Sequence, residues 1–237
     1  MKKLRLLFAV LIVGCYGLII SSCNNSGVSP TNHSRLQVIN ALAGSTPINF
    51  YLNAVKKNTS TITFPLSTGY ISVVPDTSRI QFQIAASLKY IDNTADASER
   101  HVFKVDSSYS CFVTGTTSKY ETVITLDDLS SPSNGKARVR FINTSTDAGS
   151  VDVTVNGTTG FSNIAYKGVG SFIEVPAGVY EFKAYNTGKS SNLATLSTQT
   201  LADGKIYTLY TAGLVSSTAT NAAFGLNLIT NLLPATK

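Results

Sequence analysis

Apolar and polar residues alternate along many short segments of the chain, and this pattern predicts β-strands. In VDVTV, residues 151–155, three valines alternate with an aspartate and a threonine. A period of two places one face of such a segment on a core and the other in water. Similar runs fill the second half of the chain, namely ARVRFIN, SVDVTVN, FSNIAY, GSFIEV, GVYEFKAYN, LATLSTQTL, IYTLYTAG and AAFGLNLI.

The segments between these runs are suited to tight turns. They read NGT, PAG, NTGKSS and ADGK, which are rich in Gly, Asn and Asp. Hairpins require positive φ angles, and we expect these at Asn156-Gly157 and Ala177-Gly178. No segment has a helical period of useful length. The pattern therefore predicts an all-β fold made of antiparallel β-sandwiches.

The pattern occurs twice along the chain. Three pairs of segments align, at shifts of 103, 101 and 98 positions: 36–53 with 139–156, 68–75 with 169–176, and 106–115 with 204–213. A repeat of about 100 residues is too long for a solenoid unit and suits a small β-domain. We therefore expect two tandem sandwiches.

The expected domain boundaries follow from these alignments. The first domain covers 35–129 and the second covers 137–230, with SSPSNGK at 130–136 as a short linker. The first copy carries a few more residues, which we place in the polar stretch 88–100 with helix or loop character.

A tyrosine stands at the same place in both copies. Asp203 precedes Tyr207 by four residues, which resembles the tyrosine corner of immunoglobulin-like sandwiches. In that corner the phenol bonds to backbone just upstream. The first copy has Tyr109, with Asp106 only three residues earlier. Both tyrosines are predicted to be structural rather than catalytic.

The N-terminus reads as an export signal. Lys2, Lys3 and Arg5 precede an apolar run at 6–20 without a charge. A cationic start, a short apolar segment and a small-residue boundary are typical of a secretory signal peptide. The run falls short of the roughly 20 apolar residues that a spanning helix needs.

The boundary itself resembles the bacterial lipoprotein signal, with an aliphatic residue, two small residues and a cysteine at Ile20, Ser21, Ser22 and Cys23. The resemblance implies cleavage between Ser22 and Cys23, a diacylglycerol on the Cys23 sulfur and an acyl chain on the new N-terminus. Several acyl chains give lasting membrane anchorage where one does not. We expect a signal peptide at 1–22, a lipidated tether at 23–34 and a place in the cell envelope, with the outer membrane favoured. The alternative is an ordinary secreted protein.

Charge and cysteine content narrow the picture. Removing residues 1–22 takes three cations from the total of 19 Lys and Arg, which leaves 16 against 13 acids, a net charge of +3. No basic run occurs, so we expect no nucleic-acid partner. With Cys15 in the signal and Cys23 carrying lipid, Cys111 alone remains, and no intrachain disulfide forms. Cys111 lies in a strand-like run and is predicted to be a buried apolar residue.

Three segments of the second copy resemble a bacterial family known as domain of unknown function 4397. They are ARVRFINTSTDAGSVDVTVNG at 137–157, FIEVPAGVYEFKAY at 172–185 and LADGKIYTLYTAG at 201–213. The first copy is similar more loosely, because VVPDTSRIQF replaces the PAG turn. The resemblance implies an immunoglobulin-like β-sandwich on exported, often lipidated, proteins. It implies no established activity.

No enzyme template is visible in the sequence. The two histidines, His33 and His101, lie near no nucleophile elbow, and no zinc-ligand or P-loop spacing occurs. We therefore expect neither an enzyme nor a bound cofactor.

Four carboxylates lie near turns and have two interpretations. They are either calcium ligands or local hydrogen-bond acceptors, and the second role is more common in turns. The residues are Asp127, Asp128, Asp147 and Asp152.

Aromatic residues leave a similar choice. Alternating aromatics usually fill a sandwich core, but they also form platforms on which sugars stack. The residues concerned are Tyr166, Phe172, Tyr180, Phe182 and Tyr185.

Two functions stay open. The preferred one is a non-catalytic envelope lipoprotein that presents its sandwiches to another protein or the cell wall. The alternative is a glycan-binding surface lipoprotein that serves polysaccharide capture.

Overall fold

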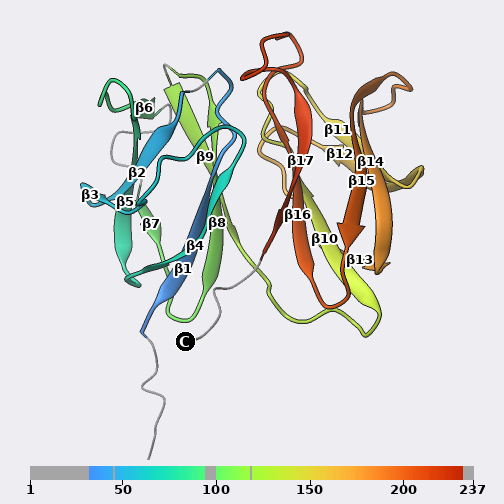
Figure 1. Ribbon diagram of the computed structural model, residues 1–237, viewed down its shortest axis with the longest axis horizontal. Helices are drawn as coiled ribbons and strands as arrows, with labels where there is room; N and C mark the ends of the chain where they lie inside the picture. The colour runs from blue at the N-terminus through green and yellow to red at the C-terminus, as the bar shows by residue number, and fades with distance from the viewer. Residues whose placement is uncertain (1–31, 45, 94–99, 118, 232–237) are drawn as a thin grey trace, which may run out of the picture. The chain divides into compact units, whose positions relative to one another are not determined.

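The computed structural model describes residues 32–44, 46–93, 100–117 and 119–231 (Figure 1). These residues form seventeen strands in four sheets and no helix, which confirms the all-β prediction. Accordingly, no helix among them is long and apolar enough to cross a membrane. The expected signal peptide and most of the tether lie outside the described residues, as does part of the polar stretch 88–100.

The first sandwich contains nine strands in two sheets, of order β4-β1-β8-β9-β6 and β3-β2-β5-β7 (Figure 1). Its core lies between these sheets, and Cys111 is fully buried there. The strands are β1 Ser34–Asn40, β2 Ile48–Leu52, β3 Val55–Lys56, β4 Ser67–Val73, β5 Thr77–Ile84, β6 Asp92–Asn93, β7 Arg100–Val102, β8 Ser108–Gly115 and β9 Lys119–Leu126.

The second sandwich has eight strands, and all eight runs predicted from the sequence are confirmed. Its sheets have the orders β13-β10-β16-β17 and β12-β11-β14-β15, with a second core between them. The strands are β10 Lys136–Ile142, β11 Val151–Val155, β12 Thr158–Ile164, β13 Ile173–Pro176, β14 Gly178–Asn186, β15 Asn192–Leu201, β16 Ile206–Ala212 and β17 Gly225–Thr230.

Strand pairing relates the two copies. β1 lies between β4 and β8, and β10 lies in the same way between β13 and β16. Leu36 pairs with Tyr109 and Val139 pairs with Tyr207, which agrees with the shifts of 103 and 98. Both pairings are parallel, so the sheets are not wholly antiparallel as expected. The reason is that β1 and β8 are joined by a long crossover through the other sheet rather than by a hairpin.

One sequence alignment is wrong by a residue. Leu36 pairs with Ile71, and its equivalent Val139 pairs with Ile173. The shift in β4 and β13 is therefore 102 rather than 101. The sequence alignment had matched the prolines that follow, at 75 and 176. A slip of one residue exchanges the two faces of a strand, so the ladder decides which side chains are equivalent.

The turn predictions met with different outcomes. Asn156 and Gly157 have φ angles of 49° and 81°, as expected for a tight hairpin between β11 and β12. The prediction of a positive φ at Ala177-Gly178 is wrong. β13 and β14 belong to different sheets, so the chain arches across the sandwich there and forms no hairpin.

The two cores place their aromatic pairs differently. In the first sandwich Phe50 of β2 and Phe82 of β5 lie with ring centroids 5.6 Å apart. The ladders make Val153 and Ala184 their equivalents. The second core thus holds two small side chains where the first holds two rings.

The second core compensates with rings elsewhere. Phe141 of β10 and Phe161 of β12 lie with centroids 5.8 Å apart, and both are buried. In the first sandwich Val38 stands at the place of Phe141, and residues 57–61 contain no aromatic side chain. Close packing needs this volume filled. The first sandwich is consequently open at this edge.

Both structural tyrosines make the same backbone contact. The Tyr207 hydroxyl accepts a hydrogen bond from Ala202 N at 3.0 Å, and the Tyr109 hydroxyl accepts one from Lys104 N at 3.1 Å. Each partner lies five residues upstream. Asp203, which suggested the corner, takes no part in this bond within the described chain. The different aspartate spacing therefore does not alter the geometry.

We expect Tyr207→Phe to lower the free energy of unfolding by about 1–3 kcal/mol, because Ala202 N would lose its partner in a partly buried place. Urea denaturation measures the change. Tyr185→Phe serves as the control, since that half-buried hydroxyl has no hydrogen bond in the described chain. Equal effects of the two substitutions would contradict a role for the Tyr207 hydroxyl.

Candidate functional site

A third apolar cluster joins the two sandwiches. It lies between the β4-β1-β8-β9-β6 sheet and the β13-β10-β16-β17 sheet, on the faces turned away from each core. All eight residues of β8 and all seven of β16 are buried, because these strands are covered on both faces. The buried members of the cluster are Ile39, Ala41, Phe112, Val123, Ile142, Tyr210 and Ala212.

Equivalent residues of the two copies meet in this cluster. Phe112 and Tyr210 occupy the same place in β8 and β16, and their ring centroids lie 5.2 Å apart. Ile39 and Ile142 are likewise equivalent, and both belong to the cluster. Contact between like residues is the mark of an isologous interface, as in a two-fold dimer. Here the interface lies within one chain.

A buried ion pair lies beside the cluster. Arg140 of β10 pairs through Nη2 with Asp127 Oδ1, and the exposed fractions of the two side chains are 3% and 0%. Asp127 also accepts hydrogen bonds from the hydroxyls of Tyr70 at 2.5 Å, Ser110 at 2.6 Å and Thr125 at 3.1 Å. The carboxylate is therefore satisfied entirely by protein donors, as a buried charge requires.

A second pair repeats the arrangement at the surface. Arg138 Nη2 lies 2.8 Å from Asp128 Oδ2, which holds the pKa of that carboxyl well below its usual range. Arg138 and Arg140 project from the same face of β10, and both guanidinium groups lie over Phe172, at 4.6 Å and 5.0 Å from the ring centroid. The consecutive aspartates that end the first sandwich are thus held by alternate arginines that begin the second.

Two buried tyrosines complete the interface. Tyr70 donates to Asp127 and accepts from Asn231 Nδ2 at 3.0 Å, and Tyr210 donates to the carbonyl of Pro65. Burial raises the pKa of both phenols well above its ordinary value, and the Asp127 charge raises that of Tyr70 further. Each tyrosine belongs to one sandwich and bonds to the other.

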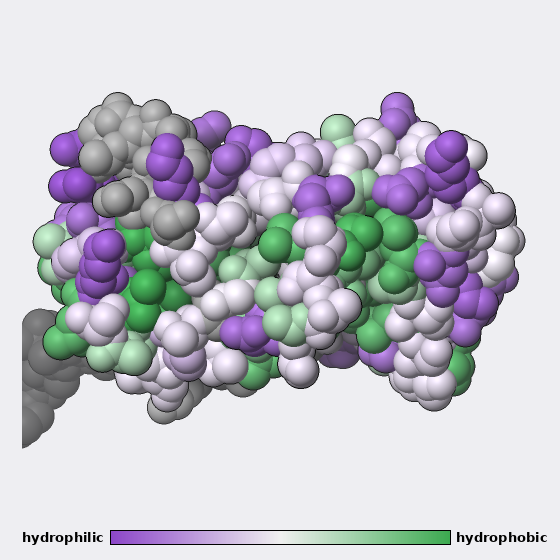
Figure 2. Space-filling model, turned by 90° about the horizontal axis from the view of Figure 1, so that it is seen from above, coloured by the Kyte–Doolittle hydropathy of each residue, from purple (hydrophilic) through white to green (hydrophobic). Residues whose placement is uncertain are grey.

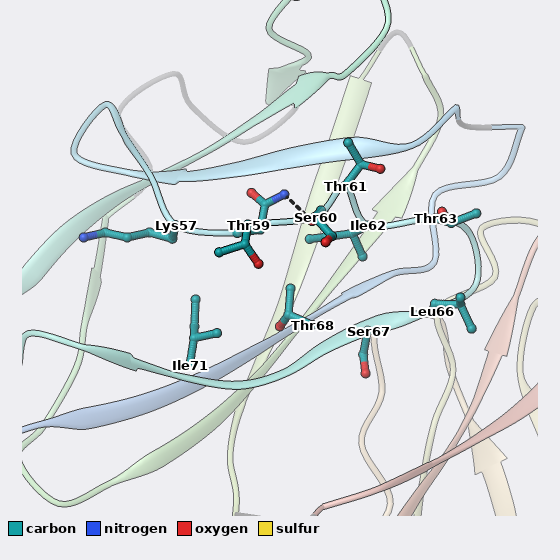
Figure 3. A pocket seen from close by; sticks show the side chains of 11 residues that line it. Lys57, Thr59, Ser60, Thr61, Ile62, Thr63, Leu66, Ser67, Thr68 and Ile71 are labelled. Carbon is teal, nitrogen blue, oxygen red and sulfur yellow. Dashed lines mark hydrogen bonds between the residues drawn. The ribbon is translucent and has the colours of Figure 1, made fainter. Parts of the chain in front are cut away.

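An open cavity of about 300 Å³ lies at the edge of the first sandwich (Figure 3). It separates β4 from the segment that follows β3. That segment bows away from the sheet. The Phe50 N–H donates a hydrogen bond to the Asn58 side chain at Oδ1, at 2.7 Å, and the backbone pairs with β2 again only at Ile62. The lining residues are Lys57, Asn58, Thr59, Ser60, Thr61, Ile62, Thr63, Leu66, Ser67, Thr68 and Ile71.

The second sandwich has no such bow. Its β12 pairs with β11 along most of its length, and Phe161 lies 5% exposed in the core opposite Val153. Counted along the ladder from the hairpin, where Val55 and Thr158 are equivalent, Phe161 corresponds to Asn58, which bonds to Phe50 N and is 6% exposed. A ring fills the second sandwich where the first has a buried amide that borders the cavity.

The aromatic residues do not gather into one platform. Phe182 is fully buried in the second core, and Tyr180 stacks on it at 6.2 Å while its hydroxyl donates to Pro176 O at 2.8 Å. Phe172 lies beneath the two arginines. Tyr166 and Tyr185 are half-buried. The arrangement therefore does not favour sugar stacking on these five rings together.

The remaining two carboxylates bind backbone. Asp147 accepts hydrogen bonds from Val215 N and Ser216 N, and Asp152 accepts one from Asn163 N at 2.6 Å. These bonds lower the pKa of both carboxyls. Within the described ranges, no group of three His, Cys, Asp or Glu side chains is placed to hold a metal ion. The four candidate aspartates are occupied separately by other protein groups.

The other candidate residues are placed as follows. His33 is exposed at the start of the described chain, and His101 packs against the rings of Phe103 and Tyr109 at 4.8 Å and 5.2 Å. Ser22 and Cys23 lie outside the described residues. Hydrophilic side chains are scattered over the face in Figure 2 and form no single patch.

These features define a tandem β-sandwich protein with a buried, charged joint between its halves. A model of the family described as domain of unknown function (DUF4397) matches residues 34–154 and 145–235. The chain belongs to this family. Both halves match, so the resemblance expected from the second copy holds for the first copy as well.

Comparisons with other proteins add little. No curated protein sequence matches the chain. The C-terminal domain of AlgF from P. aeruginosa is 15% identical, covers 40% of this chain and 99% of its own, and has a TM-score of 0.31. A leucine-rich repeat protein from Bacteroides thetaiotaomicron VPI-5482 is 17% identical, covers 75% of this chain and 25% of its own, and has a TM-score of 0.19. Likenesses at these scores carry no argument about function.

We expect Asp127→Ala to lower the free energy of unfolding by about 3–5 kcal/mol, because Arg140 would stay buried without its counter-charge. Asp128→Ala is the matched control. Its side chain is 57% exposed, so its ion pair contributes about 1 kcal/mol or less. Urea denaturation compares the two variants, and similar losses would show that burial of the joint does not set the effect.

We expect stability to fall as the pH rises above about 10, the ordinary pKa of tyrosine. The folded chain keeps protons on Tyr70 and Tyr210 that the unfolded chain loses, so each residue lowers the unfolding free energy by about 1.4 kcal/mol per pH unit. Urea denaturation at several pH values measures the slope. Tyr210→Phe should lower this slope by the contribution of about one proton. An unchanged slope would contradict the assignment.

Proposed function

We propose that this chain is a non-catalytic lipoprotein of the cell envelope, which holds a rigid pair of β-sandwiches at a membrane for contact with another envelope component. The observation that carries the proposal is the position of Cys23. It follows a cationic start, an apolar run and two small residues, in the pattern of the bacterial lipoprotein signal. The first strand begins at Ser34, so a tether of about ten residues separates the anchor from the folded part.

Two features of the fold support a role in presentation. The buried joint fixes the surfaces of the two sandwiches with respect to each other, since the ion pair and the tyrosines bond across it. The lining of the open cavity includes no His, Asp or Glu that could act as a general base and activate its Ser and Thr hydroxyls. The outer membrane is the membrane that we favour.

A second candidate function is glycan binding. One specific observation favours it, namely the cavity in the first sandwich, which is open and bordered by six Ser and Thr residues. Hydroxyl groups donate and accept hydrogen bonds, as sugar hydroxyls do.

We expect Cys23→Ala to abolish incorporation of a fatty-acid label and to leave the protein unprocessed or in the soluble fraction. The sandwiches should fold as before, because the anchor lies outside them. Metabolic labelling with an alkyne fatty acid and membrane fractionation measure the first effect, and circular dichroism the second.

Cys111→Ala is the control for this experiment. Cys111 is fully buried in the first core, so its loss should leave the label in place. Label retained by Cys23→Ala, or loss of folding in that variant, would overturn the separation of anchor and scaffold.

A further inference from the structure

We propose that the cavity of the first sandwich binds one unit of an acidic saccharide, with Lys57 pairing the acidic group and the surrounding hydroxyls pairing the sugar. The proposal deepens the second candidate function and rests on it. It assigns the site to residues that lie between β3 and β4 and leaves the second sandwich without a corresponding site.

The polar groups around the cavity are available for a ligand. In the described part of the chain, the hydroxyls of Thr59, Ser60 and Thr61 have no hydrogen-bond partner, and neither does the Lys57 amine. The backbone N–H groups of the same three residues donate to no described group. Asn58 holds the bow of this segment through its bonds to Phe50 N and Ser60 O, at 2.7 Å and 2.8 Å.

The charge of the lining favours an anion. Lys57 is the one charged residue among the eleven that line the cavity, and none of them is acidic. Its side chain lies at one end of the lining and extends away from Thr59 (Figure 3). A carboxylate or another anion on the ligand would form a charge-assisted hydrogen bond with the amine, which is stronger than a neutral bond. A cationic ligand would find no counter-charge in the lining.

The shape of the cavity suits a sugar unit. Its volume of about 300 Å³ is at the lower end of the range for small-molecule sites. Thr59 points across it toward Thr68 and Ile71 (Figure 3). Ile62, Leu66 and Ile71 supply apolar surface for the carbon skeleton, and hydroxyls border it on both sides. The cavity is open to solvent, so a polymer can continue beyond the bound unit.

A saccharide fits the lining better than a peptide does. A peptide that adds as a strand could pair only with β4, the edge strand on one side, because residues 57–61 on the other side form no strand. The hydroxyls instead match a ligand that carries many hydroxyls of its own.

The comparison between copies is the independent observation. Phe161 fills the second sandwich at the place that Asn58 takes in the first, and Phe141 fills it where the first has Val38. The first core recovers its aromatic pair at Phe50 and Phe82. The opening is thus confined to one edge of a core that is otherwise packed.

Calorimetric titration of the full-length protein in detergent tests the proposal with three probes: trigalacturonate, neutral maltotriose and triglutamate. We expect trigalacturonate to bind, and the other two to bind at least tenfold more weakly. Lys57→Gln should weaken trigalacturonate binding about tenfold, whereas Lys56→Gln, on an exposed neighbour outside the cavity, should not. Thr59→Phe should abolish binding by placing a ring in the cavity.

Circular dichroism establishes that the variants fold, and Thr59→Val, which removes one hydroxyl at little change in size, replaces Thr59→Phe if that variant does not. Equal binding of maltotriose with no effect of Lys57→Gln would overturn the acidic assignment and leave glycan binding intact. Triglutamate binding as tightly as trigalacturonate would overturn the saccharide. No binding of any probe would overturn both the site and the glycan function.

Discussion

The buried pair of Arg140 and Asp127 is the constraint on which the arrangement of the two halves depends. A charge in this place is tolerated only because each partner is neutralised and Asp127 accepts three further hydrogen bonds from hydroxyls. Those hydroxyls come from β4, β8 and β9, and the arginine comes from β10. A shift of one sandwich against the other would leave charged and polar groups without partners. The joint therefore combines apolar contact with polar bonds that fix the position of one sandwich against the other.

Local patterns in the sequence predicted the strands and the repeat, because alternation and turn residues act over a few positions. The exact equivalences depend on pairing between distant segments. Prolines at 75 and 176 suggested a shift that the ladders of Leu36 and Val139 correct. Likewise, the turn at Ala177 looked like a hairpin, and only the division of β13 and β14 between sheets shows that it is an arch.

The candidate site was harder to predict for the same reason. Asp127 and Asp128 were expected near turns, as calcium ligands or local hydrogen-bond acceptors, and no partner was predicted for them. Their partners, Arg140 and Arg138, stand ten or more residues away and are brought close by the turn of the linker. The cavity left one signal that alignment of the copies reveals: the second has Phe161 where the first has no ring between β3 and Phe64. A missing side chain is a weaker cue than a present one.

The contact between Phe112 and Tyr210 has a consequence for how the chain arose. A face that packs on its own equivalent is suited to self-association, so a single sandwich of this kind would pair with a second copy of itself. Joining the copies by a short linker makes the encounter intramolecular and independent of concentration. Duplication also removes the requirement that both partners stay identical. One copy is then free to keep a closed core while the other acquires an open cavity at its edge. The covalent link to the closed copy keeps the specialised copy folded.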